Sequence, residues 1–164
     1  MSRQEAAGRI IMKIQIRTAS IHDFPAVDAI MRQVQQLHID WRPDIYRQSA
    51  TVLPIEVYEQ AVRDQTFFVA EYEGRVAGIL FIMYRHVESA TQVTRDVIYV
   101  DSMAVDQPYR QKGIGHAFFD FLKELKAQKG LDGIELQVNA RNEAAYKMYT
   151  NYGFTNKSIN MELL

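Results

Sequence analysis

Residues 97–116 read VIYVDSMAVDQPYRQKGIGH, and this stretch decides how the rest of the sequence is interpreted. Its first part, residues 97–105, is apolar and β-branched, which predicts a strand, and Ile114 opens an apolar stripe at helical spacing. Gly113 and Gly115 at this junction let backbone N–H groups turn toward a ligand, and the first turn of a helix has unpaired donors and partial positive charge. Because Arg110 and Lys112 add two cations, the stretch favours binding of a phosphate or pyrophosphate.

The loop lacks the two common nucleotide-binding motifs. In a Walker A loop a lysine follows the glycine, whereas Lys112 precedes Gly113 here. A dinucleotide-binding fingerprint requires a third glycine three residues after Gly115, where this sequence has Phe118. The two glycines are also compatible with a tight strand-to-helix turn that binds nothing, so the loop alone leaves both interpretations open.

A second pattern follows the predicted strand Ile134–Val138. It has an asparagine, then an alanine three residues later, a tyrosine seven later and Gly-Phe eleven later, at Asn142, Ala145, Tyr149, Gly153 and Phe154. Arg110, Gly113 and Gly115 match the order Gln or Arg, two variable residues, Gly, one variable residue, Gly or Ala. With both patterns in this order, the sequence resembles the GNAT superfamily of N-acetyltransferases. The resemblance covers about Lys13 to Leu164.

The resemblance implies an α/β (α+β) fold in which a mixed, mostly antiparallel central sheet with splayed strands is flanked by four helices. In such proteins acetyl-coenzyme A lies in the gap beside the strand that precedes the phosphate-binding loop. Its pantetheine arm would pair with the backbone of Met103, Ala104 and Val105. Its pyrophosphate would be bound by Arg110, Gln111, Lys112, Gly113, Ile114, Gly115 and His116. Asn142 would contact the cofactor from the other side, and Tyr149 would point at its sulfur, although Tyr149 also shares a helical stripe with core-type residues.

Acyl transfer to an amine needs a base and an acid. An alkylammonium group with a pKa of ~10.4 must lose a proton before it can attack. Asp101 on the cofactor strand, where many similar enzymes carry Glu, is the candidate base, although it could equally pair with an arginine or a backbone amide. Ser102 replaces a second acidic residue, so a water chain is an alternative, and Glu71 and Glu88 are weaker ones. Tyr149 would protonate the departing thiolate, and without any cysteine in the chain we expect direct attack on the thioester.

The segment between the first two predicted helices, residues 38–49, borders the acceptor pocket in this family. Its candidate substrate residues mix aromatic and charged groups, namely His38, Trp41, Arg42, Asp44 and Tyr46. Such a mixture suits a small polar amine or the end of a peptide, and an ordinary solvated loop is the alternative. We expect a small-molecule primary amine as acceptor. A protein or peptide N-terminus or lysine, or a non-catalytic coenzyme A-binding interaction module, is the alternative.

The composition fits one globular domain, because 164 residues with 48% hydrophobic and 24% charged residues are enough for one packed core. A net charge of -1 gives no global attraction to nucleic acid or an anionic membrane. The histidines show no paired metal-ligand spacing, so no metal is expected. With no secretory signal and no long apolar stretch, a cytoplasmic location is the default. We expect residues 1–11 to be a disordered extension and residues 12–164 to be a single N-acetyltransferase domain that forms a homodimer.

Hydrophobic periodicity and turn residues predict the order of the elements. Strands are expected at residues 13–18, 66–72, 75–84, 97–105, 134–138 and 154–164. Helices are expected at residues 24–37, 54–62, 114–129 and 145–152. The mostly polar residues 86–95 are expected to form a connection, and the three strands around them should be antiparallel neighbours.

Overall fold

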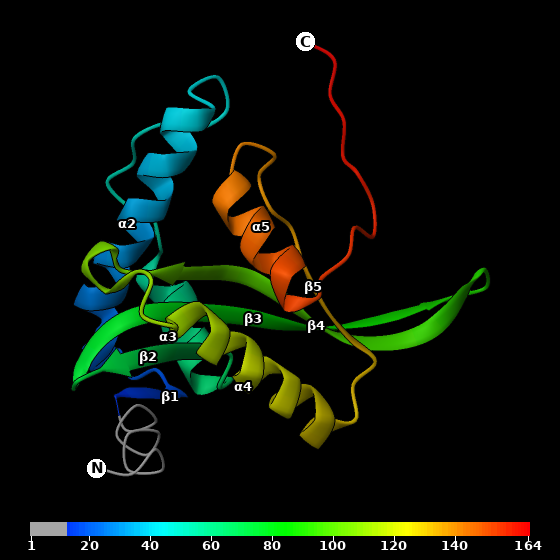
Figure 1. Ribbon diagram of the computed structural model, residues 1–164, viewed down its shortest axis with the longest axis horizontal. Coiled ribbons are helices and arrows are strands. Elements are labelled where there is room, and N and C mark those ends of the chain that lie inside the picture. The colour runs from blue at the N-terminus through cyan, green and yellow to red at the C-terminus, as the bar shows by residue number, and fades with distance from the viewer. Residues whose placement is uncertain (1–12) are drawn as a thin grey trace.

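The computed structural model describes residues 13–164, and its centre is a five-stranded sheet (Figure 1). In both sequence and spatial order, the strands are β1 (Ile14–Thr18), β2 (Phe67–Tyr72), β3 (Arg75–Ser89), β4 (Gln92–Val105) and β5 (Gly133–Leu136). The first four are antiparallel to their neighbours, and β5 is parallel to β4. The mixed, mostly antiparallel sheet predicted from the sequence is therefore confirmed. The extension expected at residues 1–11 lies outside the described residues.

Helices cover both faces of the sheet. They are α2 (Phe24–Trp41), α3 (Ile55–Arg63), α4 (Ile114–Lys129) and α5 (Glu143–Tyr152). Successive side chains of a strand point to opposite faces. Phe67 and Val69 of β2 accordingly pack in one core with α2 and α3, whereas Phe68 and Ala70 pack in a second core with α4 and α5. The sheet therefore separates two apolar cores, and the four predicted helices are confirmed.

The first long helix extends further than predicted. α2 continues to Trp41, so His38 and Trp41 lie on its last turn and not in a loop. The polar residues near its end interrupt the apolar pattern but not the backbone, because the N–H of Arg42 still donates to the carbonyl of His38 at 2.8 Å. The helix then stops because Pro43 disfavours a helical conformation for the residue before it.

Residues 86–95, predicted as a polar connection, instead extend β3 and β4 into a long hairpin arm. The arm projects beyond the helices at the right of Figure 1 and turns at Ala90 and Thr91. Because solvent reaches both of its faces, the arm lacks the apolar alternation by which strands are recognised. Cross-strand polar pairs support it instead. His86 lies opposite Asp96, and their side chains approach to 2.7 Å.

The strand predicted at residues 154–164 is not present in the described part of the chain. After α5 the backbone continues as a segment, residues 155–164, that runs away from the sheet (Figure 1). Its alternating sequence is typical of a strand, but a strand also needs a neighbouring edge to satisfy its backbone N–H and C=O groups. Within residues 13–164 the segment joins no such edge.

Candidate functional site

The strand β4 is paired on both sides over only part of its length. It pairs with β3 as far as Val105, which lies opposite Gly78. Its pairing with β5 covers only Val97 to Val100, opposite Gly133 to Leu136. In an antiparallel pair, alternate residues direct N–H and C=O away from the partner strand. Beyond Val100, these groups of β4 are therefore directed into the opening between β4 and β5, where Met103, Ala104 and Val105 were expected to bind the pantetheine arm.

Asp101 lies at the point where β4 and β5 separate. Phe81 of β3 pairs with Ser102 while Ile82 pairs with Val100, which makes Asp101 the extra residue of a β-bulge. A bulge redirects a side chain out of the regular alternation of a strand. Asp101 is exposed, and the hydroxyl of Ser102 donates to its carboxylate at 2.9 Å. The candidate base is thus accessible to solvent, which is compatible with proton transfer to water.

The structure requires glycine at two positions of the predicted phosphate-binding loop, Gly113 and Gly115, for different reasons. Gly113 precedes α4 with a φ of +90°, a left-handed conformation that a side chain would strain. A Cβ at Gly115 would instead meet the sulfur of Met148 at 3.0 Å, so this glycine lets α5 approach α4. Gln111 also has a positive φ of 62° although it is not glycine. The loop is therefore held in an uncommon conformation directly before the helix N-terminus.

Cationic side chains surround this N-terminus. The ammonium of Lys112 lies 5.5 Å from the ring of Tyr72, and Nε of Arg110 donates to the carbonyl of Val105 at 3.2 Å. His116 is exposed, with its ring 5.6 Å from that of Tyr152. Ile114, by contrast, is buried at 1% exposure, so only its backbone N–H can serve a ligand. The loop, the helix end and the open part of β4 together fit a phosphorylated ligand with an extended arm.

The helix α5 closes the other side of this region. Oδ1 of Asn142 accepts from the N–H of Ala145 at 3.2 Å and caps the helix, which leaves the NH2 group as the part that would contact a cofactor. The ring of Tyr149 packs 5.7 Å from Phe119 and 5.9 Å from Phe154. Burial raises the pKa of Tyr149 above its usual value of 10.0, so the hydroxyl keeps its proton at neutral pH. Tyr149 is thus both a packed aromatic residue and a possible proton donor.

The candidate substrate residues lie together at the end of α2. The ring of His38 is 4.8 Å from Tyr46 and 6.0 Å from Trp41. Burial lowers the pKa of His38, which favours its neutral form at neutral pH. Arg42 pairs with Asp44 at 2.6 Å and also with Glu162 of the C-terminal segment. The structure therefore brings the candidates together in one cluster at the end of α2, made of an aromatic group and a charged group. The two groups are linked through the backbone, where the N–H of Tyr46 donates to the carbonyl of Arg42 at 2.9 Å.

Comparison with protein families places these features in context. A sequence model of the acetyltransferase (GNAT) family matches residues 31–154. The chain belongs to the acetyltransferase (GNAT) family. It is 33% identical over 69 residues to the [ribosomal protein bS18]-alanine N-acetyltransferase of Escherichia coli K12, covering 42% of this chain and 47% of that protein. It is 29% identical over 100 residues to the N-acetylaspartate synthetase of Danio rerio, covering 61% of this chain and 33% of that protein. The chain thus spans less than half the length of these curated relatives.

Solved structures extend the likeness over nearly the whole GNAT domain. A mutant of the BH1408 protein from Bacillus halodurans has a TM-score of 0.86 at 25% identity, covering 92% of this chain and 98% of that one. An aminoglycoside N-acetyltransferase in complex with coenzyme A has a TM-score of 0.67 at 14% identity, with coverage of 92% and 98%, and this likeness concerns the fold. None of the helices within residues 13–164 of this GNAT protein is both long and apolar enough to cross a lipid bilayer.

Two contacts near the candidate site were not anticipated from the sequence. Nε2 of Gln33 on α2 donates to Asp106 at 2.7 Å, and its Oε1 accepts from the N–H of Gln107 at 3.2 Å. These bonds tie α2 to the end of β4, directly before the predicted phosphate-binding loop. The second unanticipated contact is the ion pair between Glu162 and Arg42. A glutamine on a polar helix face and a glutamate near a chain end carry no local signal for such roles.

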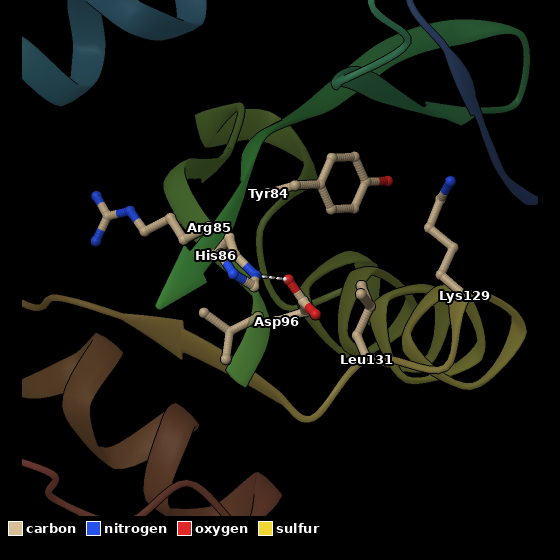
Figure 2. Close-up of a pocket in the computed structure, with 7 residues that line it drawn as sticks. Tyr84, Arg85, His86, Asp96, Lys129 and Leu131 are labelled. Atoms are coloured by element: carbon tan, nitrogen blue, oxygen red, sulfur yellow. Dashed lines mark hydrogen bonds and ion pairs between the residues drawn. The ribbon is translucent and has the colours of Figure 1, made fainter. Parts of the chain in front are cut away.

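The remaining charged candidates lie elsewhere. Glu71 is paired with Arg17 at 2.8 Å, and Glu88 lies on the hairpin arm, 3.2 Å from His86. A pocket of about 400 Å³ lies at the base of this arm, and His86, Asp96 and Lys129 are among its lining residues. Figure 2 shows the contact between His86 and Asp96 on one side of the pocket and Lys129 on the other. Lys129 ends α4, so this cavity is separated from Gly113 by a helix of 16 residues, about 24 Å long. The cavity is therefore distinct from the candidate acetyl-transfer site.

Proposed function

We propose that this protein transfers an acetyl group from acetyl-coenzyme A to a primary amine of a small molecule. The observation that carries the proposal is the separation of β4 from β5 beyond Val100, next to the left-handed Gly113 at the start of α4. This arrangement offers strand backbone groups to an extended arm and helix N–H groups to a pyrophosphate. The cytoplasmic location and the homodimer expected from the sequence are part of the same proposal.

Different residues of this chain would carry out the separate steps of acetyl transfer. Acetyl-coenzyme A would supply the acetyl group as a thioester. Met103, Ala104 and Val105 would hold its arm, and backbone N–H groups of the open strand would stabilise negative charge on the carbonyl oxygen. Asp101, directly or through water, would accept the proton of the amine. Tyr149, whose hydroxyl stays protonated, would donate a proton to the departing sulfur.

The acceptor class is supported by the cluster at the end of α2. His38, Trp41 and Tyr46 supply aromatic surfaces, which attract cations, and Asp44 and Glu162 supply carboxylates nearby. Such surroundings suit an amine that carries polar groups. A peptide N-terminus is the second candidate, and it is favoured by the match to a relative that is a ribosomal-protein alanine N-acetyltransferase.

A thiol-release assay with a panel of amines tests the activity. The panel contains polyamines, aminoglycosides, amino acids and peptides, each incubated with acetyl-coenzyme A and the full chain. We expect acetyl transfer to a small amine, confirmed by the mass of the product. Transfer to peptides alone would replace the first candidate by the second. Binding of acetyl-coenzyme A without any amine-dependent thiol release would support the non-catalytic coenzyme A-binding module instead.

A pair of glycine variants tests the binding site independently of the acceptor. Gly113 and Gly130 both have positive φ, +90° and +64°, and they flank the two ends of the same helix α4. Gly113→Val should remove most of the thermal stabilisation by acetyl-coenzyme A, which amounts to about 2.7 kcal/mol at a hundredfold excess over Kd. Gly130→Val introduces a similar strain but should retain ligand binding. Equal ligand affinity in both variants, measured by calorimetry, would refute the proposed pyrophosphate-binding site at the N-terminus of α4.

A further inference from the structure

The outer part of β3 has an open backbone edge on the side of β2. The pairing of β2 with β3 ends at Phe81, and β3 continues beyond it into the hairpin arm. The N–H of Ile82 points to this side of the strand, because it donates to the carbonyl of Thr66 at 3.0 Å. Residues two apart in a strand direct their N–H and C=O groups the same way. The backbone groups of Tyr84 and His86 therefore face this edge, and within residues 13–164 no strand pairs with them there.

A groove of about 740 Å³ lies along this edge, between β3 and α3. Val57 of α3 and Met83 and Tyr84 of β3 contribute apolar surface to it, and Val57 is 46% exposed. Within the described part of the chain, the charged side chains that line the groove are the carboxylates of Glu56 and Asp64. The groove thus combines an open strand edge, apolar walls and negative charge.

Neither carboxylate of the groove is neutralised by an ion pair among residues 13–164. Asp64 accepts a hydrogen bond from the amide of Gln60 at 2.9 Å, and Arg63 of the same helix donates to the oxygen of that amide and not to a carboxylate. The guanidinium of Arg85, on the arm, lies 3.3 Å from the centre of the ring of Tyr99. Both carboxylates can therefore accept cations from a ligand.

The two faces of the sheet differ in charge at this edge. Met83 lies on the same face of β3 as Phe81, which packs in the core with α3, so this face looks toward the carboxylates of the groove. On the opposite face, the ammonium of Lys129 lies 5.2 Å from the ring of Tyr84 (Figure 2). Basic side chains of an added strand would therefore be attracted to the first face and repelled from the second.

We propose that the groove binds an extended peptide in which lysine or arginine residues alternate with apolar residues, and that this peptide adds as a strand to the edge of β3. Main-chain hydrogen bonds to Tyr84 and His86 would hold its backbone. Its basic side chains would lay their aliphatic stems on Val57 and Met83 and place their charges beside the two carboxylates. A peptide uses all three features of the groove, whereas a small cation uses only the charge and the apolar walls. The inference concerns binding alone and goes beyond the proposed function.

Fluorescence anisotropy with synthetic peptides tests the proposal on the full chain without acetyl-coenzyme A. The probe is a labelled peptide of alternating lysine and valine, which should bind saturably, whereas the same peptide with glutamate in place of lysine should not. Backbone N-methylation of all the valines, or of all the lysines, removes the N–H groups along one edge of the strand. Only one of these two peptides should lose binding, because only one edge of the added strand faces β3. No saturable binding of the probe, or the same affinity of both N-methylated peptides, would overturn the proposal.

A pair of charge variants tests where the peptide binds. Glu56→Lys reverses one carboxylate of the groove and should weaken binding of the lysine–valine peptide by about fivefold, the equivalent of one exposed ion pair. Glu59→Lys makes the same change on α3 but outside the lining of the groove, so it should leave the affinity unchanged. Equal weakening by both variants would assign the effect to net charge and refute binding in the groove.

Two further measurements distinguish the peptide from other occupants of the groove. Displacement of the labelled peptide by an equal concentration of n-butylamine would identify a small cation as the occupant. Dimerisation of the chain that the peptide abolishes, followed by sedimentation equilibrium, would identify a second copy. We expect neither result, because only an added strand uses the open edge and both carboxylates together, and either one would overturn the proposal.

Discussion

The two halves of β4 share one strand but have different neighbours. From Val97 to Val100 the strand is held by β3 on one side and β5 on the other, whereas from Asp101 to Val105 only β3 remains. The first half is core, with Ile98 at 0% and Val100 at 5% exposure. In the second half, Met103 and Ala104 are only half-buried. The comparison teaches that one strand can belong to the core and also offer an open backbone edge, when its pairing on one side ends early and a bulge marks the border.

The bulge at Asp101 marks the border between these halves. One extra residue ends the regular alternation where β5 stops, and it moves a carboxylate out to solvent. The closed half of β4, Val97 to Val100, should therefore contribute mainly to stability. The open half, Asp101 to Val105, should contribute mainly to binding and catalysis. Substitutions on either side of the border should separate these effects.

The largest expected effect concerns the hydroxyl of Tyr149, the proposed proton donor. Tyr149→Phe keeps the packing against Phe119 and Phe154 and removes the acid, so acetyl transfer should fall by ~10²- to 10⁴-fold with little change in cofactor affinity. Tyr152→Phe is the matched control on the same helix, since its hydroxyl donates to Asp120 at 2.7 Å. It should leave the rate nearly unchanged. Near-normal turnover of Tyr149→Phe with a confirmed acceptor would assign the proton to water or another residue.

The next prediction tests how much the packing of the closed half contributes to stability. Ile98 is fully buried, so Ile98→Ala should lower the free energy of unfolding by about 2–5 kcal/mol through lost burial and a cavity. Met103→Ala in the half-buried open part should cost less stability, because part of the lost surface was already in water. Urea denaturation of both variants measures the difference. Equal losses at the two positions would show that the halves are equally packed.

Much of the fold was predictable because its strongest signals are local. The stripe of α4 and the glycine after it predicted the helix at residues 114–129, and the structure has the same bounds. The hairpin arm was missed because two solvated faces leave no apolar alternation to detect. The final strand was predicted from a real alternation at Ile159, Met161 and Leu163, but an alternating sequence does not supply the neighbouring edge that a strand needs, and within residues 13–164 the segment joins none.

The candidate site shows the same limit. The loop residues and Tyr149 were predicted as site residues because they lie in short motifs, and Asp101 was predicted from its place on the strand before the loop. Gln33 and Glu162 act through partners 73 and 120 residues away, so no local pattern distinguishes them from ordinary surface residues. Contacts of this range become visible only when the fold brings the segments together.

A smaller effect tests how the open half is positioned. Gln33 joins α2 to Asp106 and Gln107. Gln33→Leu should lower the free energy of unfolding by about 1–2 kcal/mol through these lost hydrogen bonds. It should also weaken cofactor binding, because the turn before the predicted phosphate-binding loop loses its contact with α2. Gln36→Leu on the exposed face of the same helix is the control and should leave cofactor affinity unchanged. Titration calorimetry gives both affinities. A Gln33 variant that loses stability but binds the cofactor normally would limit this residue to a structural role.

The smallest effect concerns the strand that closes the first half of β4. Glu135 of β5 accepts from Lys157 at 2.7 Å and lies 3.2 Å from Arg95, and these contacts lower its pKa from the ordinary value of 4.5. Between the lowered folded pKa and the unfolded value, the unfolded chain binds more protons, so acidification favours unfolding. The stabilisation is therefore complete above pH 4.5 and is lost as the pH falls through the folded pKa. Because Lys157 is largely exposed, we expect only ~0.2–1 kcal/mol. Urea denaturation between neutral and acidic pH, compared with Glu135→Gln, should show the two proteins converging in stability at low pH. A difference that stays constant across this range would mean that the carboxylate charge does not help to hold β5 in place.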